Sequence, residues 1–118
     1  MEIKFRFVYR HRQNYDYKFQ YYTLEEIMDG KYTEYKLLHD GYEKVDVNNF
    51  IGLQDDKGTD IYEGDMLKYL SGIAGTQDQE DIITEVIYLD GAYMDGVTRT
   101  YIGWCDWEVI GKKYEYIK

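Results

Sequence analysis

From about residue 45 to the C-terminus, short apolar segments alternate with polar turns that contain glycine. The segments are rich in β-branched and aromatic residues, which favour extended strands. Short, closely spaced strands with almost no helix between them are typical of a small barrel or sandwich. The strand candidates in this half are residues 61–62, 66–70, 82–89, 97–102, 104–110 and 114–117.

The first 22 residues carry a second β pattern. Apolar and polar side chains alternate from Ile3 to Tyr9 and again from Tyr15 to Tyr21, with polar residues at 11–14 between them. A period of two is typical of a half-buried strand. We therefore expect an antiparallel hairpin over residues 3–22. Further strands are expected at residues 32–38 and 42–47.

One short helix is expected directly after this hairpin. Thr23 and Glu26 have the spacing of a capping box, in which each side chain bonds the backbone N–H of the other residue. An apolar stripe follows, and Gly30 provides a left-handed stop. The predicted fold class is mainly β (α+β). The hairpin and helix occupy residues 1–44, and a small barrel domain occupies residues 45–118.

The charge of the chain limits its partners. It has 14 basic and 23 acidic residues and a net charge of −9, which argues against nucleic acid as a partner because phosphate contacts need clustered Lys and Arg. Residues 1–22 carry five basic residues against two acids, whereas residues 23–118 carry nine against twenty-one. One interpretation is a basic edge strand on an acidic body. The other is head-to-tail contact between copies of the chain.

Catalytic and metal-binding patterns are weak. Cys105 is the only cysteine, so an internal disulfide is excluded, and a nucleophilic pair of Cys105 with a histidine stays open. Residues 55–60 are acidic, but their spacing does not fit a calcium loop. No run of apolar residues is long enough to span a membrane, and the N-terminus has no apolar leader. We expect a cytoplasmic protein with no cofactor and no metal.

Fifteen tyrosines are the most unusual feature of the composition. In a β-rich protein, many tyrosines cover the edge of the core while the hydroxyl stays in water. Aromatic side chains are also enriched in protein interfaces. Several crowd the N-terminal third, and we treat five of them as a candidate interface: Tyr9, Tyr15, Tyr17, Tyr21 and Tyr22.

Residues 50–67, which we call the hallmark segment, read F-I-G-L-Q-D-D-K-G-T-D-I-Y-E-G-D-M-L. This segment resembles the characteristic pattern of the YopX family of phage and prophage proteins, approximately Y-T-G-L-x-D-x-x-G-x-x-I-Y-E-G-D-I-V. The I-K-F-R sequence at residues 3–6 and the E-V-I-G sequence at 108–111 are similar to the start and end of that family. Departures include Ile51 for the usual Thr and Lys112-Lys113 for Asn-Ile.

The resemblance implies an SH3-like C-terminal barrel, a phage or prophage origin and an uncharacterised function. It also suggests a structural role for the turn residues, because glycine accepts positive φ and an aspartate can bond turn amides. These residues are Gly52, Gly58, Gly64, Asp65 and Gly111.

The first functional hypothesis is a non-enzymatic interaction module that binds a host protein, a phage protein or a second copy of itself. A second is an acidic mimic of nucleic acid that inhibits a host defence enzyme. A third is a small hydrolase that uses Cys105.

Overall fold

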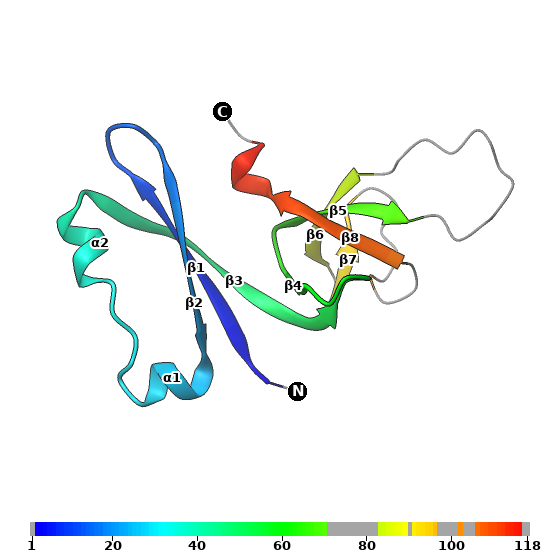
Figure 1. Cartoon of the computed structure of the whole chain (residues 1–118), viewed down its shortest axis with the longest axis horizontal. Coiled ribbons are helices and arrows are strands. Elements are labelled where there is room, and N and C mark those ends of the chain that lie inside the picture. Colours follow the sequence, from blue (N-terminus) through cyan, green and yellow to red (C-terminus); the bar gives the residue numbers. More distant parts are fainter. Residues whose placement is uncertain (1, 71–82, 90, 97–101, 103–105, 117–118) are drawn as a thin grey trace, which may run out of the picture. The chain divides into compact units, whose positions relative to one another are not determined.

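The computed structural model describes residues 2–70, 83–89, 91–96, 102 and 106–116. The chain divides into two compact units, Met1–Phe50 and Ile51–Lys118 (Figure 1). The fold is mainly β, as predicted, with two four-stranded sheets and short helices. One sheet has the strand order β2-β1-β3-β4, and the other has the order β7-β6-β5-β8.

The first unit is built on β1 (Lys4–His11), β2 (Tyr17–Thr23) and the first part of β3 (Tyr42–Gln54). β1 pairs with both neighbours in antiparallel register, which confirms the predicted hairpin. Two helices, α1 (Leu24–Met28) and α2 (Tyr35–His39), follow β2. They cover one face of this sheet, because Ile27 and Leu37 pack against a core of Phe7, Tyr9 and Tyr42.

The predicted capping box is present at the start of α1. The Thr23 hydroxyl accepts the Glu26 backbone N–H at 3.1 Å, and the Glu26 carboxylate accepts the Thr23 N–H at 3.0 Å. The hydrogen bond from the Thr23 backbone is the main reason that the pKa of Glu26 lies below its ordinary value. This local pattern therefore determines where α1 begins.

The strand predicted at residues 32–38 is wrong, because α2 occupies residues 35–39. Glu34 lies at the N-cap of α2 but makes no capping bond with its side chain. Its carboxylate instead bonds Tyr9 and Tyr32. The helix is held through Leu37 in the core, so the usual sequence signal for a helix start is missing.

Arg6 is one of the polar residues in the alternating segment from Ile3 to Tyr9, yet only 1% of its surface is exposed. Its Nε donates to Oδ1 of Asn48 at 2.8 Å, and its guanidinium lies 5.8 Å from the centre of the Phe19 ring. Asn48 is directly opposite Arg6 on β3, so cross-strand pairing supplies the acceptor that a buried guanidinium needs.

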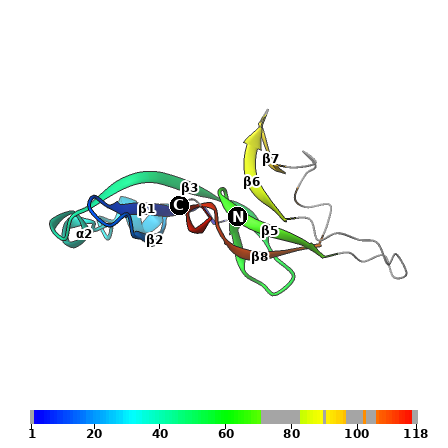
Figure 2. The ribbon, with the colours of Figure 1, turned by 90° about the horizontal axis from the view of Figure 1, so that it is seen from above.

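The second unit contains β4 (Asp60–Tyr62), β5 (Asp65–Leu70), β6 (Ile83–Leu89), β7 (Ala92–Asp95) and β8 (Asp106–Lys112). Figure 2 shows the β6–β7 hairpin turned away from the β5–β8 pair. The hydrophobic core of this unit contains one residue each from β4, β5, β6 and β8, together with Ile102. These residues are Ile61, Leu67, Val86, Ile102 and Trp107.

One strand prediction for the second unit needs correction. The strand expected at residues 114–117 is wrong at 114–115, where the chain forms the 3₁₀ helix η2 (Lys113–Glu115) with Tyr114 buried. The Glu115 carboxylate stabilises this turn by accepting the Lys112 N–H at 3.1 Å. In the part of the chain that the structure describes, β7 and β8 are the two ends of the second sheet and no closed barrel is formed, so the SH3-like barrel stays a prediction.

Several predicted features lie outside the described residues. They are Cys105 and most of the strand expected at 97–102. The predicted boundary between residues 44 and 45 stays a prediction.

Candidate functional site

The five candidate interface tyrosines do not form one surface. Directly opposite residues of an antiparallel pair share a face of the sheet. Tyr22 lies opposite Phe5, whereas Tyr21 lies opposite Arg6 and Tyr17 opposite Arg10. Tyr9 and Tyr22 are therefore on the face that the helices cover. Tyr17 and Tyr21 are on the other face.

Tyr9 is a core residue with no exposed surface, so it cannot belong to a surface interface in this structure. The β1–β3 register shifts between Val8 and Tyr9, and the four residues 6–9 are all buried. The hydroxyl of Tyr9 donates to Oε2 of Glu34 at 2.9 Å. Its role is to join β1 to the segment that precedes α2.

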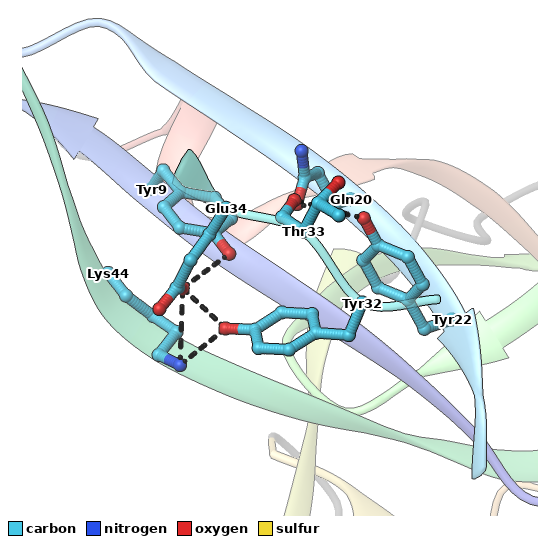
Figure 3. Close-up of polar contacts among 7 residues, drawn as sticks. All are labelled: Tyr9, Gln20, Tyr22, Tyr32, Thr33, Glu34 and Lys44. Atoms are coloured by element: carbon cyan, nitrogen blue, oxygen red, sulfur yellow. Dashed lines mark hydrogen bonds and ion pairs between the residues drawn. The ribbon is translucent and has the colours of Figure 1, made fainter. Parts of the chain in front are cut away.

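A polar cluster of Tyr9, Tyr32, Glu34 and Lys44 is centred on that carboxylate (Figure 3). Oε2 of Glu34 also accepts a hydrogen bond from the Tyr32 hydroxyl. Lys44 Nζ lies 3.4 Å from the same oxygen and donates to the Tyr32 hydroxyl at 2.8 Å. Two strands and the segment between the helices meet in this cluster.

Electrostatics in this cluster favour the charged Glu34 carboxylate. Burial alone raises its pKa, but hydrogen bonds from Tyr32, Tyr9 and Lys44 outweigh that effect and lower the pKa below its ordinary value. Burial, with the hydrogen bonds to Tyr32 and Glu34, raises the pKa of Tyr9. The contact with Tyr32 is the main reason that the pKa of Lys44 is raised. The cluster thus holds a stable ion pair at neutral pH.

Aromatic packing continues beside the cluster. The rings of Phe7, Tyr22 and Tyr32 form a triangle with centroids 4.9 to 5.7 Å apart. The Tyr22 hydroxyl lies within hydrogen-bonding distance of Gln20 Oε1 (3.2 Å) and the Thr33 carbonyl (3.3 Å). A general base needs a free lone pair that a substrate can reach. The packed rings and the contacts of the Tyr22 hydroxyl do not provide one, and they are suited instead to anchoring residues 30–34.

The three remaining candidate interface tyrosines, Tyr15, Tyr17 and Tyr21, are at least partly exposed to solvent. Tyr15 lies in the turn between β1 and β2 with 64% of its surface exposed, and Tyr21 on β2 is 50% exposed. Tyr17 and Phe19 are half-buried and share the face of Tyr21, because they are spaced by two along β2. We call Tyr15, Tyr17 and Tyr21 the β2 tyrosines.

The hallmark segment forms two turns. In the first, Oδ1 of Asp55 accepts the N–H groups of Lys57 (2.9 Å) and Thr59 (2.8 Å), while Oδ2 accepts the N–H of Val109 on β8 (3.0 Å). Gly58 supplies the positive φ of this turn, +82°. A salt bridge of 2.7 Å between Lys57 and Glu108 makes a second link to β8.

The second turn joins β4 to β5. Gly64 has φ of +88°, and the buried Asp65 accepts the Tyr62 N–H at 2.8 Å. Gly64 also donates to the Val86 carbonyl at 3.0 Å and accepts from Lys113 N–H at 2.8 Å. Its backbone therefore joins β6 to η2.

The other two turn glycines have different surroundings. Gly52 lies within β3 with φ of +87°. A Cβ at Gly111 would lie 3.2 Å from the ring of Tyr116, so close packing favours glycine there.

The part of the chain that the structure describes contains no group of three or more His, Cys, Asp or Glu residues placed to hold a metal ion. Its helices are all too short or too polar to cross a membrane.

Comparison with known protein families confirms the resemblance that the hallmark segment indicates. The YopX family, described as YopX protein, matches residues 4–116, which is nearly the whole chain. The chain belongs to the YopX family. In this YopX family protein, Asp55 and Asp65 of the hallmark segment accept hydrogen bonds from backbone N–H groups in two turns. Among solved structures, the chain is similar to protein EF1440 from Enterococcus faecalis at 20% identity and a TM-score of 0.44, over 92% of this chain and 71% of that one. No curated protein matches it.

Sequence reasoning missed Glu34 and Lys44 as organising residues. They are 10 positions apart in the sequence, and Glu34 lies 25 residues from its partner Tyr9. A single acidic residue before a short helix gives no pattern by which such a long-range contact could be found.

Proposed function

We propose that this YopX family protein is a non-enzymatic interaction module. Its contact surface is formed by the β2 tyrosines, with Tyr17 and Tyr21 on one face of β2 and Tyr15 in the turn that precedes this strand. The exposure of Tyr15 and Tyr21 beside the half-buried Tyr17 is the observation that carries the proposal. Rigid tyrosine rings provide contact area at low entropic cost, and they are enriched where proteins bind each other.

The hydrogen bonds made by three carboxylates, two in the hallmark segment and one at Glu34, support an interaction role over catalysis. Asp55 and Asp65 bond backbone N–H groups of their turns. Glu34 accepts bonds from two tyrosines and a lysine. Carboxylates engaged in this way are poorly suited to general acid–base chemistry.

The proposal includes the setting implied by the family resemblance. The protein acts in the cytoplasm of a bacterium that carries a phage or prophage, and its partner is a host protein, a phage protein or a second copy. The SH3-like barrel that the resemblance implies for the second unit is part of this proposal.

The test compares two tyrosine variants. Tyr17→Ser combined with Tyr21→Ser is expected to abolish capture of a partner or self-association. Tyr88→Ser is the matched control, because Tyr88 is 56% exposed but lies on β6. Amide spectra of the second unit should be unchanged in the double variant, and those of the first unit should be unchanged in Tyr88→Ser. Binding that survives in the double variant with the fold intact would refute the proposal.

The acidic-mimic hypothesis remains the second candidate because residues 23–118 hold twenty-one acids against nine basic residues. Mimicry of nucleic acid would make binding fall steeply with ionic strength, whereas an aromatic contact would change little. A salt series on the captured complex separates the two.

A further inference from the structure

The turn between β1 and β2 holds a bulky residue in a left-handed backbone conformation. Tyr15 has φ of +62°, and it is the one non-glycine residue with positive φ in the described chain. Its N–H donates to the His11 carbonyl at 3.1 Å. Glycine or asparagine adopts this conformation with far less strain. Such strain at an exposed aromatic residue is a reason to look for function.

Two arginines near this turn share one carboxylate, and one of them, Arg10, lies beside Tyr15. Arg10 Nη2 is 3.5 Å from Glu43 Oε1, and Arg12 Nε is 3.9 Å from Glu43 Oε2. Close guanidinium–carboxylate bonds measure roughly 2.7–2.9 Å, so both contacts are long. The side chain of Arg12 is 66% exposed. The two guanidinium groups thus retain capacity for a second carboxylate.

Arg10 connects the arginine pair to the ring. Its guanidinium carbon lies 5.6 Å from the centre of the Tyr15 ring, which is cation–π distance. Its Nε is buried and has no hydrogen-bond acceptor within the described part of the chain. The ring and the guanidinium therefore form one surface at the end of the hairpin.

His11 holds this surface in place. Its Nδ1 accepts the N–H groups of Gln13 (3.2 Å) and Asn14 (3.4 Å), and its Nε2 lies 3.1 Å from the Asp40 carbonyl. The neutral tautomer with its proton on Nε2 satisfies all three contacts. The turn is therefore tied both to itself and to the segment before β3, so that Tyr15 is preorganised.

We propose that the hairpin tip, made of Arg10, Arg12 and Tyr15, binds an acidic segment of a protein partner. A carboxylate of that segment lies between the two guanidinium groups, and an apolar or aromatic neighbour packs on the Tyr15 ring. This inference rests on the proposed interaction function and names the partner chemistry for one end of the same surface.

Charge favours a short acidic segment over nucleic acid. Residues 10–18 hold three basic residues and one acid, whereas the whole chain has a net charge of −9. A polyanion that extends beyond the tip meets repulsion from this net charge. A peptide with a few carboxylates needs only the tip.

The test uses a fluorescein-labelled peptide of alternating glutamate and tyrosine, with a lysine–tyrosine peptide and a single-stranded oligonucleotide as comparison probes. Fluorescence anisotropy at low salt should show binding of the acidic peptide alone. Arg12→Glu should weaken this binding by about tenfold or more, because a charge-assisted bond becomes a repulsion. Lys36→Glu, an exposed charge reversal on α2, should have little effect.

Tyr15→Gly provides a second, opposed readout. It should raise the stability of the fold because it relieves the left-handed strain, yet it should weaken peptide binding because the ring is lost. Absence of peptide binding, indifference to both tip variants, or tighter binding of the oligonucleotide would overturn the inference. If tip variants keep the natural partner while the Tyr17/Tyr21 double variant loses it, the tip inference fails and the interaction function stands.

Discussion

The carboxylate of Asp55 accepts the backbone N–H of Val109 at 3.0 Å, across 54 positions of sequence. This bond joins the first hallmark turn to β8. The backbone N–H of Asp56 donates to the Trp107 carbonyl at 3.1 Å nearby, and Lys57 pairs with Glu108. The hallmark segment of this YopX protein therefore links two parts of the second unit that are remote in sequence.

Asp55→Ala should destabilise the second unit by about 2 kcal/mol, because three backbone N–H groups lose their acceptor. Urea unfolding measures the loss, and hydrogen exchange at Val109 should accelerate. Asp56→Ala is the control, since the Asp56 side chain is exposed at the same turn. Equal stability of the two variants would contradict the role assigned to Asp55.

The pH dependence of stability should carry the signature of Asp55. Burial alone raises its pKa, but hydrogen bonds from Val109, Thr59 and Lys57 outweigh burial and lower the pKa below its ordinary value. A depressed carboxyl pKa stabilises the fold above the unfolded value of about 3.9, and this contribution is lost as pH falls through the folded pKa. A carbon-detected NMR titration of the carboxyl should show the lowered value. A midpoint at or above the ordinary value would count against the hydrogen-bond geometry.

Glu34→Ala should destabilise the first unit by about 2 kcal/mol, because the buried Tyr9 hydroxyl and the Lys44 ammonium lose their acceptor. Faster hydrogen exchange in α2 should accompany the loss, since the cluster holds the segment before that helix. Glu25→Ala on the exposed face of α1 should cost little. Unchanged exchange in α2 would show that Leu37 alone anchors it.

Gly41→Ala should cost more stability than Gly58→Ala. Both residues have positive φ, so each variant carries backbone strain of about 1 kcal/mol. A Cβ at Gly41 would also lie 2.9 Å from Nε2 of His11, whereas a Cβ at Gly58 would meet nothing within 4 Å. Thermal unfolding compares the two. A larger loss for Gly58→Ala would contradict the close packing of His11 against this turn.

Sequence patterns predicted the elements whose causes are local. The capping box of Thr23 and Glu26 started α1, and alternation from Ile3 to Tyr21 produced the hairpin. The polar residues before β4 formed a turn because Asp55 bonds amides only two and four positions away. Chemistry of this kind is visible in the sequence.

Features that depend on distant partners were not visible in the same way. The burial of Arg6 depends on Asn48, 42 positions later, and α2 forms where Glu34 engages Tyr9 in place of a cap. The candidate interface was split because neighbours such as Tyr21 and Tyr22 point to opposite faces of β2. The pairing and pleat of the strands decide the first and the last of these cases, and a long-range side-chain contact decides the second.

Hydrogen exchange of the protein alone and in its captured or self-associated complex tests the central claim most directly. The claim is that the β2 tyrosines form the contact surface. Amide protection should increase over residues 15–23 and remain unchanged in β6 and β7. Increased protection confined to the second unit, with residues 15–23 exchanging as in the free protein, would contradict it.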